Sequence, residues 1–298
     1  FWAKAVADAE GENLTGLFTP KFLLGTRDRI GTAGSCFAQH IGRALSQAGV
    51  QIVVTEPSPP FLSEDEAAHF GFGLYSCRYG NIYTPRQMVQ LLAEALNDSA
   101  PETPIWRKKR RYFDALRPNI EPDGLESERE VRLHRAEHLA AIRAMLGQIT
   151  TFIFTLGMTE SWCDLASGRT LPLCPGVIAG EYSAESTAFQ NFRYPEILAD
   201  LAAIRSLLHQ VNPAIRLLLT VSPVPLTATA SGNHVLAATI RSKASLRAAA
   251  GDFAADHDDV DYFPSYEIIT SPASRGQWYE PNLRQVRASG VARVMSCF

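Results

Sequence analysis

Apolar residues follow two spacings along the chain, one typical of buried strands and one typical of amphipathic helices. Short apolar runs predict strands at 29–32, 51–54, 150–156, 215–221 and 260–263. Longer segments with helical periodicity predict helices at 37–48, 85–96, 127–147, 195–211 and 235–250. Because the two types alternate, we expect an α/β fold built on a doubly wound, largely parallel sheet.

Three segments between these elements, 56–84, 98–126 and 165–192, are too long to be simple connections. We expect them to be loop or cap insertions that help to build a site, within a single domain that spans residues 1–298. Two helix starts carry local signals. Pro85 suits the first position of a helix, and Ser127 followed by Glu130 fits a capping box.

Composition narrows the class of protein. With 46% hydrophobic and 20% charged residues, the 298-residue chain is not a mainly disordered one. Its net charge of −3 gives no general attraction to nucleic acid, and no apolar run reaches the roughly 18 residues of a membrane span. The first residues lack the basic and apolar regions of a signal peptide, although the chain does not begin with Met, which leaves a trimmed N-terminal signal open.

The cysteines point to a reducing compartment. There are five, widely spaced and with no CxxC pair, which is a poor disulfide framework and a poor zinc site. We therefore expect free thiols, a cytoplasmic location, no structural metal and no cofactor.

Candidate chemistry gathers where strands end, because ligands of open α/β sheets bind outside the carboxyl ends of the strands. Four short segments follow predicted strands, at 34–36, 157–160, 222–225 and 264–267. In the first, Ser35 stands where a strand turns into a helix, and the helix N-terminus would stabilise an oxyanion there. Ser35 could instead merely cap the helix. Cys36 is a competing nucleophile, because a helix N-terminus lowers the pKa of a thiol.

These residues also carry a family resemblance. The segment GTAGSCFAQHI resembles the signature of the GSCFA family, and four more segments match it in order: TLGMTESW, LTVSPVPLTAT, RSKASL and DYFPSYEI. The family is grouped with the SGNH/GDSL hydrolases. The resemblance therefore implies a flavodoxin-like, three-layer α/β/α sandwich. It also implies a nucleophilic Ser35, oxyanion donors from a Gly and an Asn in later segments, and a late Asp-His pair that activates the serine.

The oxyanion and substrate-binding residues transfer unevenly. Gly157 matches the family's glycine, and Thr159 stands where the superfamily has Asn, with a hydroxyl or N–H that could face an oxyanion. Glu160 could orient a base or hold a substrate hydroxyl, or Thr159 and Glu160 could simply cap a helix. Asn81 is the candidate for the remaining donor, and Cys36 is expected to contribute at the oxyanion or substrate site.

The general base is the weakest match. Asn282 and Gln285 occupy the positions of the late Asp-x-x-His, and neither is a base at neutral pH. His234 is the best replacement, since it follows a predicted strand at the same edge of the sheet; the plain alternative is a solvated or capping residue. His40 is the second choice.

For two other patterns we favour a structural interpretation over a functional one. His134 and His138 stand at helical spacing in HRAEH, which is similar to a zinc-binding HExxH, but a solvated helix face is the simpler interpretation. The basic run 107–111 lies among aromatic residues, as in nucleic-acid sites, yet an exposed face or a patch for an anionic ligand suits it better.

We therefore expect a serine esterase or O-acyltransferase that works on an acylated glycan or small metabolite through a Ser35 acyl-enzyme. His234 and Glu160 would complete the catalytic set. The alternatives are a carbohydrate- or anion-binding protein on the same fold with an incomplete triad, and a thiol enzyme that uses Cys36. Neither nucleic acid nor a membrane span is expected, and the sequence leaves the oligomeric state open.

Overall fold

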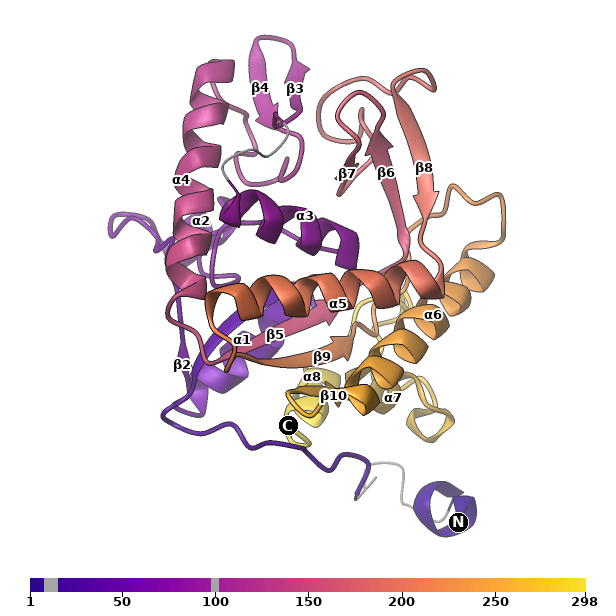
Figure 1. The fold of residues 1–298 in the computed structure, drawn as a ribbon. Helices are drawn as coiled ribbons and strands as arrows, with labels where there is room; N and C mark the ends of the chain where they lie inside the picture. Colours follow the sequence, from indigo (N-terminus) through magenta and orange to yellow (C-terminus); the bar gives the residue numbers. More distant parts are fainter. Residues whose placement is uncertain (8–15, 98–101) are drawn as a thin grey trace.

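The computed structural model describes residues 1–7, 16–97 and 102–298, so the first four residues of the expected insertion at 98–126 lie outside the described part (Figure 1). A five-stranded sheet forms the centre of the molecule. Its strands lie in the order β2 (Gln51–Ile52), β1 (Arg29–Gly34), β5 (Thr151–Leu156), β9 (Arg216–Val221) and β10 (Val260–Phe263). All four neighbouring pairs are parallel. From β1 the strand order extends to β2 on one side and through β5, β9 and β10 on the other, as in flavodoxin-like sheets, which confirms the expected architecture.

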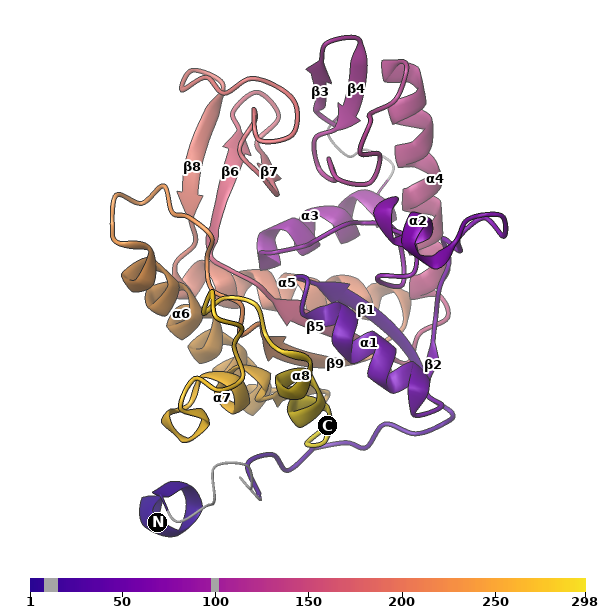
Figure 2. The same cartoon turned by 180° about the vertical axis from the view of Figure 1, so that it is seen from behind.

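Helices cover both faces of the sheet, which gives three layers (Figures 1 and 2). One face carries α3 (Pro85–Leu96), α4 (Glu128–Leu146), α5 (Tyr194–Val211) and α6 (Val235–Asp256). The other carries α1 (Ala38–Gln47), α7 (Ser265–Thr270) and α8 (Ala288–Met295). In β5, Phe152 and Phe154 pack in the first core and Ile153 in the second. Every residue of β5 is buried, as expected for a strand covered on both sides.

The predicted helix starts are largely confirmed. Pro85 begins α3, and Thr84 and Gln87 form a capping box around it. Ser127 caps α4 by accepting a hydrogen bond from the Glu130 N–H. Glu130 does not complete the box, because its carboxylate accepts from the N–H of Glu126 instead.

The long insertions contain secondary structure that the sequence pattern does not predict. Segment 56–84 holds α2 (Glu64–His69), and the next insertion holds an antiparallel hairpin of β3 (Ile105–Lys108) and β4 (Arg111–Asp114). A second antiparallel sheet has the order β7 (Arg169–Leu171), β6 (Glu160–Asp164) and β8 (Thr187–Asn191). Trp106 and Phe113 of the hairpin share a small core with Leu171 and Ala179. The two sheets rise together on one side of the central sheet (Figure 1).

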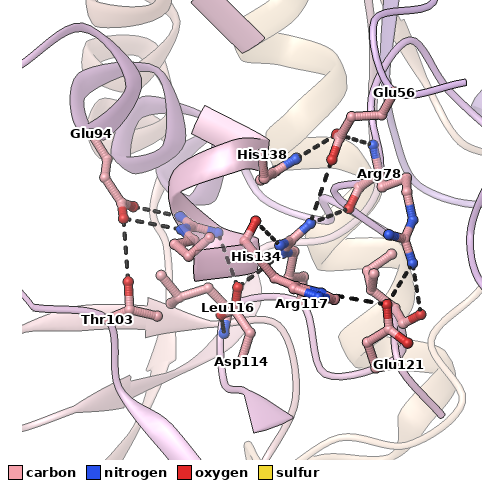
Figure 3. Close-up of polar contacts among 12 residues, drawn as sticks. Glu56, Arg78, Glu94, Thr103, Asp114, Leu116, Arg117, Glu121, His134 and His138 are labelled. Atoms are coloured by element: carbon pink, nitrogen blue, oxygen red, sulfur yellow. Dashed lines mark hydrogen bonds and ion pairs between the residues drawn. The ribbon is translucent and has the colours of Figure 1, made fainter. Parts of the chain in front are cut away.

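A buried ion-pair network joins α4 to the hairpin and to α3 (Figure 3). Arg135 of α4 lies between Glu94 of α3, at 2.5 Å, and Asp114 of β4, at 3.5 Å. Arg117 pairs with the same aspartate at 2.9 Å. These contacts fix the insertion to the body of the domain through side chains that are almost fully buried.

His138, also on α4, belongs to this network rather than to a solvated face, so that expectation is wrong. Its Nδ1 lies 2.6 Å from Glu56 Oε2, and the ring has no exposed surface. Burial lowers the pKa of His138 to about 3. Burial alone would raise the pKa of Glu56, but the hydrogen bond to His138 and the charge of Arg117 outweigh it and lower that pKa to about 2.

Candidate functional site

The turn after β1 is fixed against β5 at the point where the strand order reverses. Gly34 has φ of +141°, and a Cβ there would lie 2.4 Å from the Thr155 carbonyl oxygen, so only glycine fits. The next N–H, that of Ser35, donates to the same carbonyl at 3.1 Å. Ligands of doubly wound sheets bind at such a reversal, so the turn holds the position expected of a site.

Ser35 does not present a bare hydroxyl at this position, in contrast to the expectation. The residue is 3% exposed, and its Oγ is enclosed without a hydrogen-bond partner. Gly157 packs closely on it, since a Cβ at that glycine would lie 3.1 Å from the Ser35 Cβ. The alternative expectation, that Ser35 caps the helix, is also wrong, because its side chain does not cap α1.

Cys36 is the exposed residue of the turn. Its sulfur faces the N–H groups of Cys36 and Phe37, which stand before α1 and donate to no backbone carbonyl in the described part of the chain. Burial of the sulfur by its neighbours raises the pKa of the thiol, while the charges of Arg284 and Lys243 and the two N–H groups act in the opposite direction. The thiolate therefore has stabilising partners but needs a base to form at neutral pH.

Lys243 of α6 brings such a base into the interior. The residue is 1% exposed, and its Nζ donates to the Gly157 carbonyl at 2.5 Å. Burial lowers the pKa of Lys243 to about 7, and the nearby Cys36 limits the shift. Lys243 is the lysine of RSKASL, a segment that resembles the family, but the sequence pattern did not assign it a role. The available signal was its helical spacing with Thr239 and Leu246, which places a lysine on a buried face.

Arg284 is the second cation that the sequence analysis missed. It lies in a turn shaped by Asn282, whose Oδ1 accepts from the N–H groups of Arg284 and Gln285 at 3.0 Å each. Thus Asn282 and Gln285, which were expected at the positions of the late Asp-x-x-His, hold the turn. The Arg284 Nε is buried and has no hydrogen-bond partner. Its charge acts on the thiol of Cys36.

A chain of polar side chains lies beside the turn. The N–H of Ile82 donates to the Gly34 carbonyl at 2.9 Å, which brings Asn81 to the site as expected. Tyr75 donates to Asn81 Oδ1 at 2.6 Å and accepts from Gln39 at 3.2 Å. Gln39 and Tyr75 also line a pocket of about 290 Å³ alongside α1.

Asn81 also forms a hydrogen bond with the phenol of Tyr83. Burial raises the pKa of Tyr83, and the charge of Cys36 raises it further. Burial likewise raises the pKa of Tyr75, again with a contribution from Cys36. Both phenols therefore stay protonated beside the thiol.

The segment after β5 does not provide the expected free donors. The N–H of Gly157 donates to the Tyr83 carbonyl at 2.9 Å. Thr159 is buried, its N–H donates to Ser242, and its hydroxyl donates to Asn191 at 2.8 Å. These bonds leave neither residue a free donor for an oxyanion.

Glu160 begins β6 rather than capping a helix, and its carboxylate accepts from Thr229 at 2.7 Å. It therefore fixes the segment before α6, and no hydrogen bond joins it to Ser35 or Cys36.

His234 is the exposed N-cap of α6, where its Nδ1 accepts from the N–H of Leu236 at 3.2 Å. No hydrogen bond joins it to Ser35. Lys243 lies nine residues further along the same helix, which is roughly 13 Å of helix axis. The capping alternative is therefore confirmed for His234. His40, the second choice, is half-buried and packs on the ring of Phe37, and burial lowers its pKa.

Other candidate chemistry finds a structural explanation. Among the described residues, no group of three or more His, Cys, Asp or Glu side chains could hold a metal ion. The basic run forms the turn and flanks of the β3–β4 hairpin, where Arg111 pairs with Glu126 at 3.6 Å.

All five cysteines, each at a described position, are free. No helix in the described part of the chain is long and apolar enough to cross a membrane.

Taken together, the end of β1 holds an exposed thiol, two N–H groups without carbonyl acceptors, a buried amine and a guanidinium. A thiol with an amine that can take its proton forms a nucleophile and base. N–H groups at a helix N-terminus can hold the oxyanion of a tetrahedral intermediate.

Comparison with known proteins identifies the family of the chain. The family model described as the GSCFA family matches residues 29–298. The match begins at the first residue of β1 and includes the turn, Lys243 and Arg284. No curated protein matches the chain.

Proposed function

The chain belongs to the GSCFA family, and we propose that it is an acyl-transfer enzyme, an esterase or O-acyltransferase for an acylated glycan or small metabolite. The proposal keeps the acyl-enzyme of an SGNH-like hydrolase but moves the nucleophile by one residue, from Ser35 to Cys36. The observation that carries it is that Cys36 is the exposed residue of the turn before α1, and that the charges of Lys243 and Arg284 act on its thiol.

Access favours Cys36 over Ser35. A nucleophile must reach a carbonyl carbon to about 3 Å, which the enclosed oxygen of Ser35 cannot do without a rearrangement of the turn. Lys243 supports the base role that His234 was expected to fill. With its pKa lowered to about 7, a substantial fraction of the amine is neutral at physiological pH.

The proposed reaction forms and then breaks a thioester on Cys36. Neutral Lys243 takes the proton of the Cys36 thiol, directly or through a water molecule, and the sulfur attacks the ester carbonyl. The N–H groups of Cys36 and Phe37 stabilise the oxyanion as the C–S bond forms. The ester C–O bond breaks, and the leaving alcohol receives the proton from Lys243. Water or an acceptor hydroxyl then attacks the thioester, which regenerates the thiol.

The neighbouring pocket supports a polar substrate. Its lining combines hydrogen-bonding side chains, among them Gln39, Ser46 and Gln47, with apolar ones such as Ile52, Val54 and Leu74. Such a mixed lining suits a sugar ring, which has hydroxyl groups at its edge and C–H groups on its faces. We therefore assign the pocket to the glycan or metabolite part of the ester.

The test compares two adjacent substitutions. Cys36→Ala should reduce turnover of a chromogenic acetate ester by at least a hundredfold, and rapid quenching of the wild type should yield an acetyl adduct on the Cys36 peptide. Ser35→Ala should stay within about tenfold of the wild type, because it removes an enclosed hydroxyl. Cys174→Ala is the matched control for loss of a free thiol.

The outcomes separate the alternatives. Loss of activity in Ser35→Ala with activity retained in Cys36→Ala would return the nucleophile to Ser35. A wild type that binds acylated sugars but turns over none of them would refute acyl transfer and support the binding protein with an incomplete catalytic set.

A further inference from the structure

Two cations beside Cys36 lack carboxylate partners. In the described part of the chain, neither Lys243 nor Arg284 forms an ion pair, whereas other buried or half-buried arginines do. Lys243 bonds only to the Gly157 carbonyl. The acidic residue of the turn that holds Arg284 is already engaged, because Glu280 lies 3.7 Å from Arg287.

The reaction itself balances only one of these charges. When Lys243 takes the proton of Cys36, the ammonium and the thiolate compensate each other. The guanidinium stays charged at every pH at which proteins are stable. Arg284 therefore holds a positive charge next to the nucleophile with no negative charge to meet it. A partly desolvated charge of this kind is stabilised by an anion that binds there.

The geometry of the turn presents this cation rather than leaving it free to move. Asn282 fixes the backbone of Arg284, and the hydroxyl of Tyr279 donates to the Pro223 carbonyl at 2.8 Å, beyond the carboxyl end of β9. Tyr279 and Val286 pair as an isolated bridge across the turn. The guanidinium is thus held near Cys36 and Tyr83, on which its charge acts.

We propose that Arg284 binds an anionic group of the substrate, a carboxylate or a phosphate, beside the ester that Cys36 attacks. The inference rests on the proposed function and narrows its substrate class to esters of acidic sugars or acidic metabolites. A planar guanidinium can bind either anion through two parallel hydrogen bonds, which also fixes the orientation of the ester.

The first experiment needs no substrate and no turnover. Iodoacetate and iodoacetamide alkylate thiols by the same reaction, but iodoacetate is an anion and iodoacetamide is neutral. The ratio of their alkylation rates at Cys36 therefore measures how strongly a nearby cation attracts an anion. Peptide mass spectrometry gives the ratio at Cys36 and, as an internal reference, at Cys174. We expect a higher iodoacetate preference at Cys36 than at Cys174. Arg284→Gln should lower that preference about tenfold, as one nearby charge does at intermediate dielectric.

Two variants control the measurement. Arg284→Lys keeps the charge and should retain most of the preference, which also guards against a folding defect of the glutamine variant. Arg110→Gln removes one positive charge from the exposed tip of the β3–β4 hairpin and should leave the ratio unchanged. An unchanged ratio in Arg284→Gln would overturn the proposal. This includes the case in which both reagents react more slowly by the same factor, because Arg284 would then only lower the pKa of the thiol.

A second experiment identifies the anion. Glucuronate, glucose 6-phosphate and glucose are tested for protection of Cys36 against iodoacetamide. Protection by glucuronate alone assigns a carboxylate, and protection by the phosphate ester alone assigns a phosphate. In both cases Arg284→Gln should abolish protection. Equal protection by glucose would overturn the proposal. Retained anion preference without any ester turnover would leave the anion site standing and remove the acyl-transfer function.

Discussion

Lys243 of α6 places an ammonium group in the protein interior, where, among the described residues, the Gly157 carbonyl oxygen is its hydrogen-bond acceptor. Burying such a group costs free energy, and the protein lowers that cost by losing the proton. The same property that makes the amine a base at neutral pH therefore makes it a liability for stability. Function and stability make opposite demands on this one residue.

This conflict gives a pH-dependent prediction. Lys243→Met should abolish acyl transfer and leave the free energy of unfolding unchanged or higher at pH 6, since it removes a buried charge. The pKa of Lys243 is about 7 in the folded protein, below the ordinary lysine value of 10.5, so between these values the unfolded state binds the extra proton. The wild type should therefore gain stability relative to the variant as pH rises from 7 to 9, by at most about 1.4 kcal/mol per pH unit.

Urea unfolding at pH 6, 7, 8 and 9 measures this difference. Parallel curves for the wild type and Lys243→Met over this range would show that the lysine does not titrate there. The amine would then be a buried cation rather than a base.

Gly157 provides a second prediction at the residue scale. In Gly157→Ala the new Cβ would lie 2.9 Å from the Tyr83 carbonyl oxygen and 3.1 Å from the Ser35 Cβ. We expect a loss of about 1–3 kcal/mol of stability from overpacking, together with a change in the alkylation rate of Cys36. Gly25→Ala, where nothing lies within 4 Å, is the control. Equal stability of the two variants would show that the turn accommodates the added methyl group without a loss of stability.

The sequence located the turn but misassigned several of its side chains. Position along the chain indicates which strand end a residue follows, and this places Cys36 in the turn. Asn81 is placed near it by a different signal, its position at the end of an aromatic loop just before a helix. It does not indicate which of two neighbours points outward, and here Ser35 is enclosed and Cys36 is exposed. His234 was attractive as a histidine, yet the helix carries Lys243 to the Gly157 carbonyl beside the turn instead.

At the scale of elements, α4 is held to its neighbours by ion pairs rather than by an apolar face alone. Arg135 bridges Glu94 and Asp114 in an almost fully buried position (Figure 3). Such a network adds little net stability as a whole. Removal of one partner leaves the remaining buried charges less well compensated, so the docking of the hairpin depends on the members of the network together.

We predict that Arg135→Met lowers the free energy of unfolding by up to about 3–5 kcal/mol, because Glu94 and Asp114 each lose one of their buried arginine partners. The control lies on the same helix. Arg132 pairs with Glu102 and Glu128 at the exposed surface, and Arg132→Met should cost less than about 1 kcal/mol. Chemical denaturation compares the two variants, and similar losses would show that burial does not determine the strength of these pairs.

His138 makes the same helix sensitive to acid. The pKa of His138 is about 3 in the folded protein, below the ordinary histidine value of 6.5, so between these values only the unfolded state takes up the proton. Stability should therefore fall as pH decreases through this window, by up to about 1.4 kcal/mol per unit. Unfolding is measured between pH 6.5 and 4.5, above the folded pKa of Glu56. His40, whose pKa burial also lowers, contributes in this range to the wild type and to the variant alike. His138→Gln should flatten the profile, and an equally steep profile would assign the effect elsewhere.

The predicted and unpredicted elements differ in how they are buried. The strands of the central sheet are packed on both faces, so they appear as continuous apolar runs, and α3, α4 and α5 start within one residue of their predicted first positions. The strands of the two small sheets contain many polar residues, since one face meets solvent or the ion-pair network. Their apolar residues meet only in the folded insertion, through contacts such as Trp106 with Leu171.

At the scale of the whole molecule, topology rather than local sequence brings the site together. The turn after β1, the segment after β5, helix α6 and the turn at Arg284 come from four distant parts of the chain (Figure 2). They meet because parallel strands place their carboxyl ends at one edge. The sequence could predict this edge from the alternation of strands and helices, but not the side-chain distances across it.

The pairing of β1 with β5 also has a consequence for synthesis on the ribosome. Apart from the two-residue partner β2, β1 has no neighbouring strand until Thr151–Leu156 has left the exit tunnel. The carbonyl of Thr155 that anchors the Ser35 N–H is part of that late segment. On nascent chains of increasing length, the thiol of Cys36 should react with maleimide as an unfolded residue until β5 emerges, because formation of this parallel pair must wait for a long-range contact.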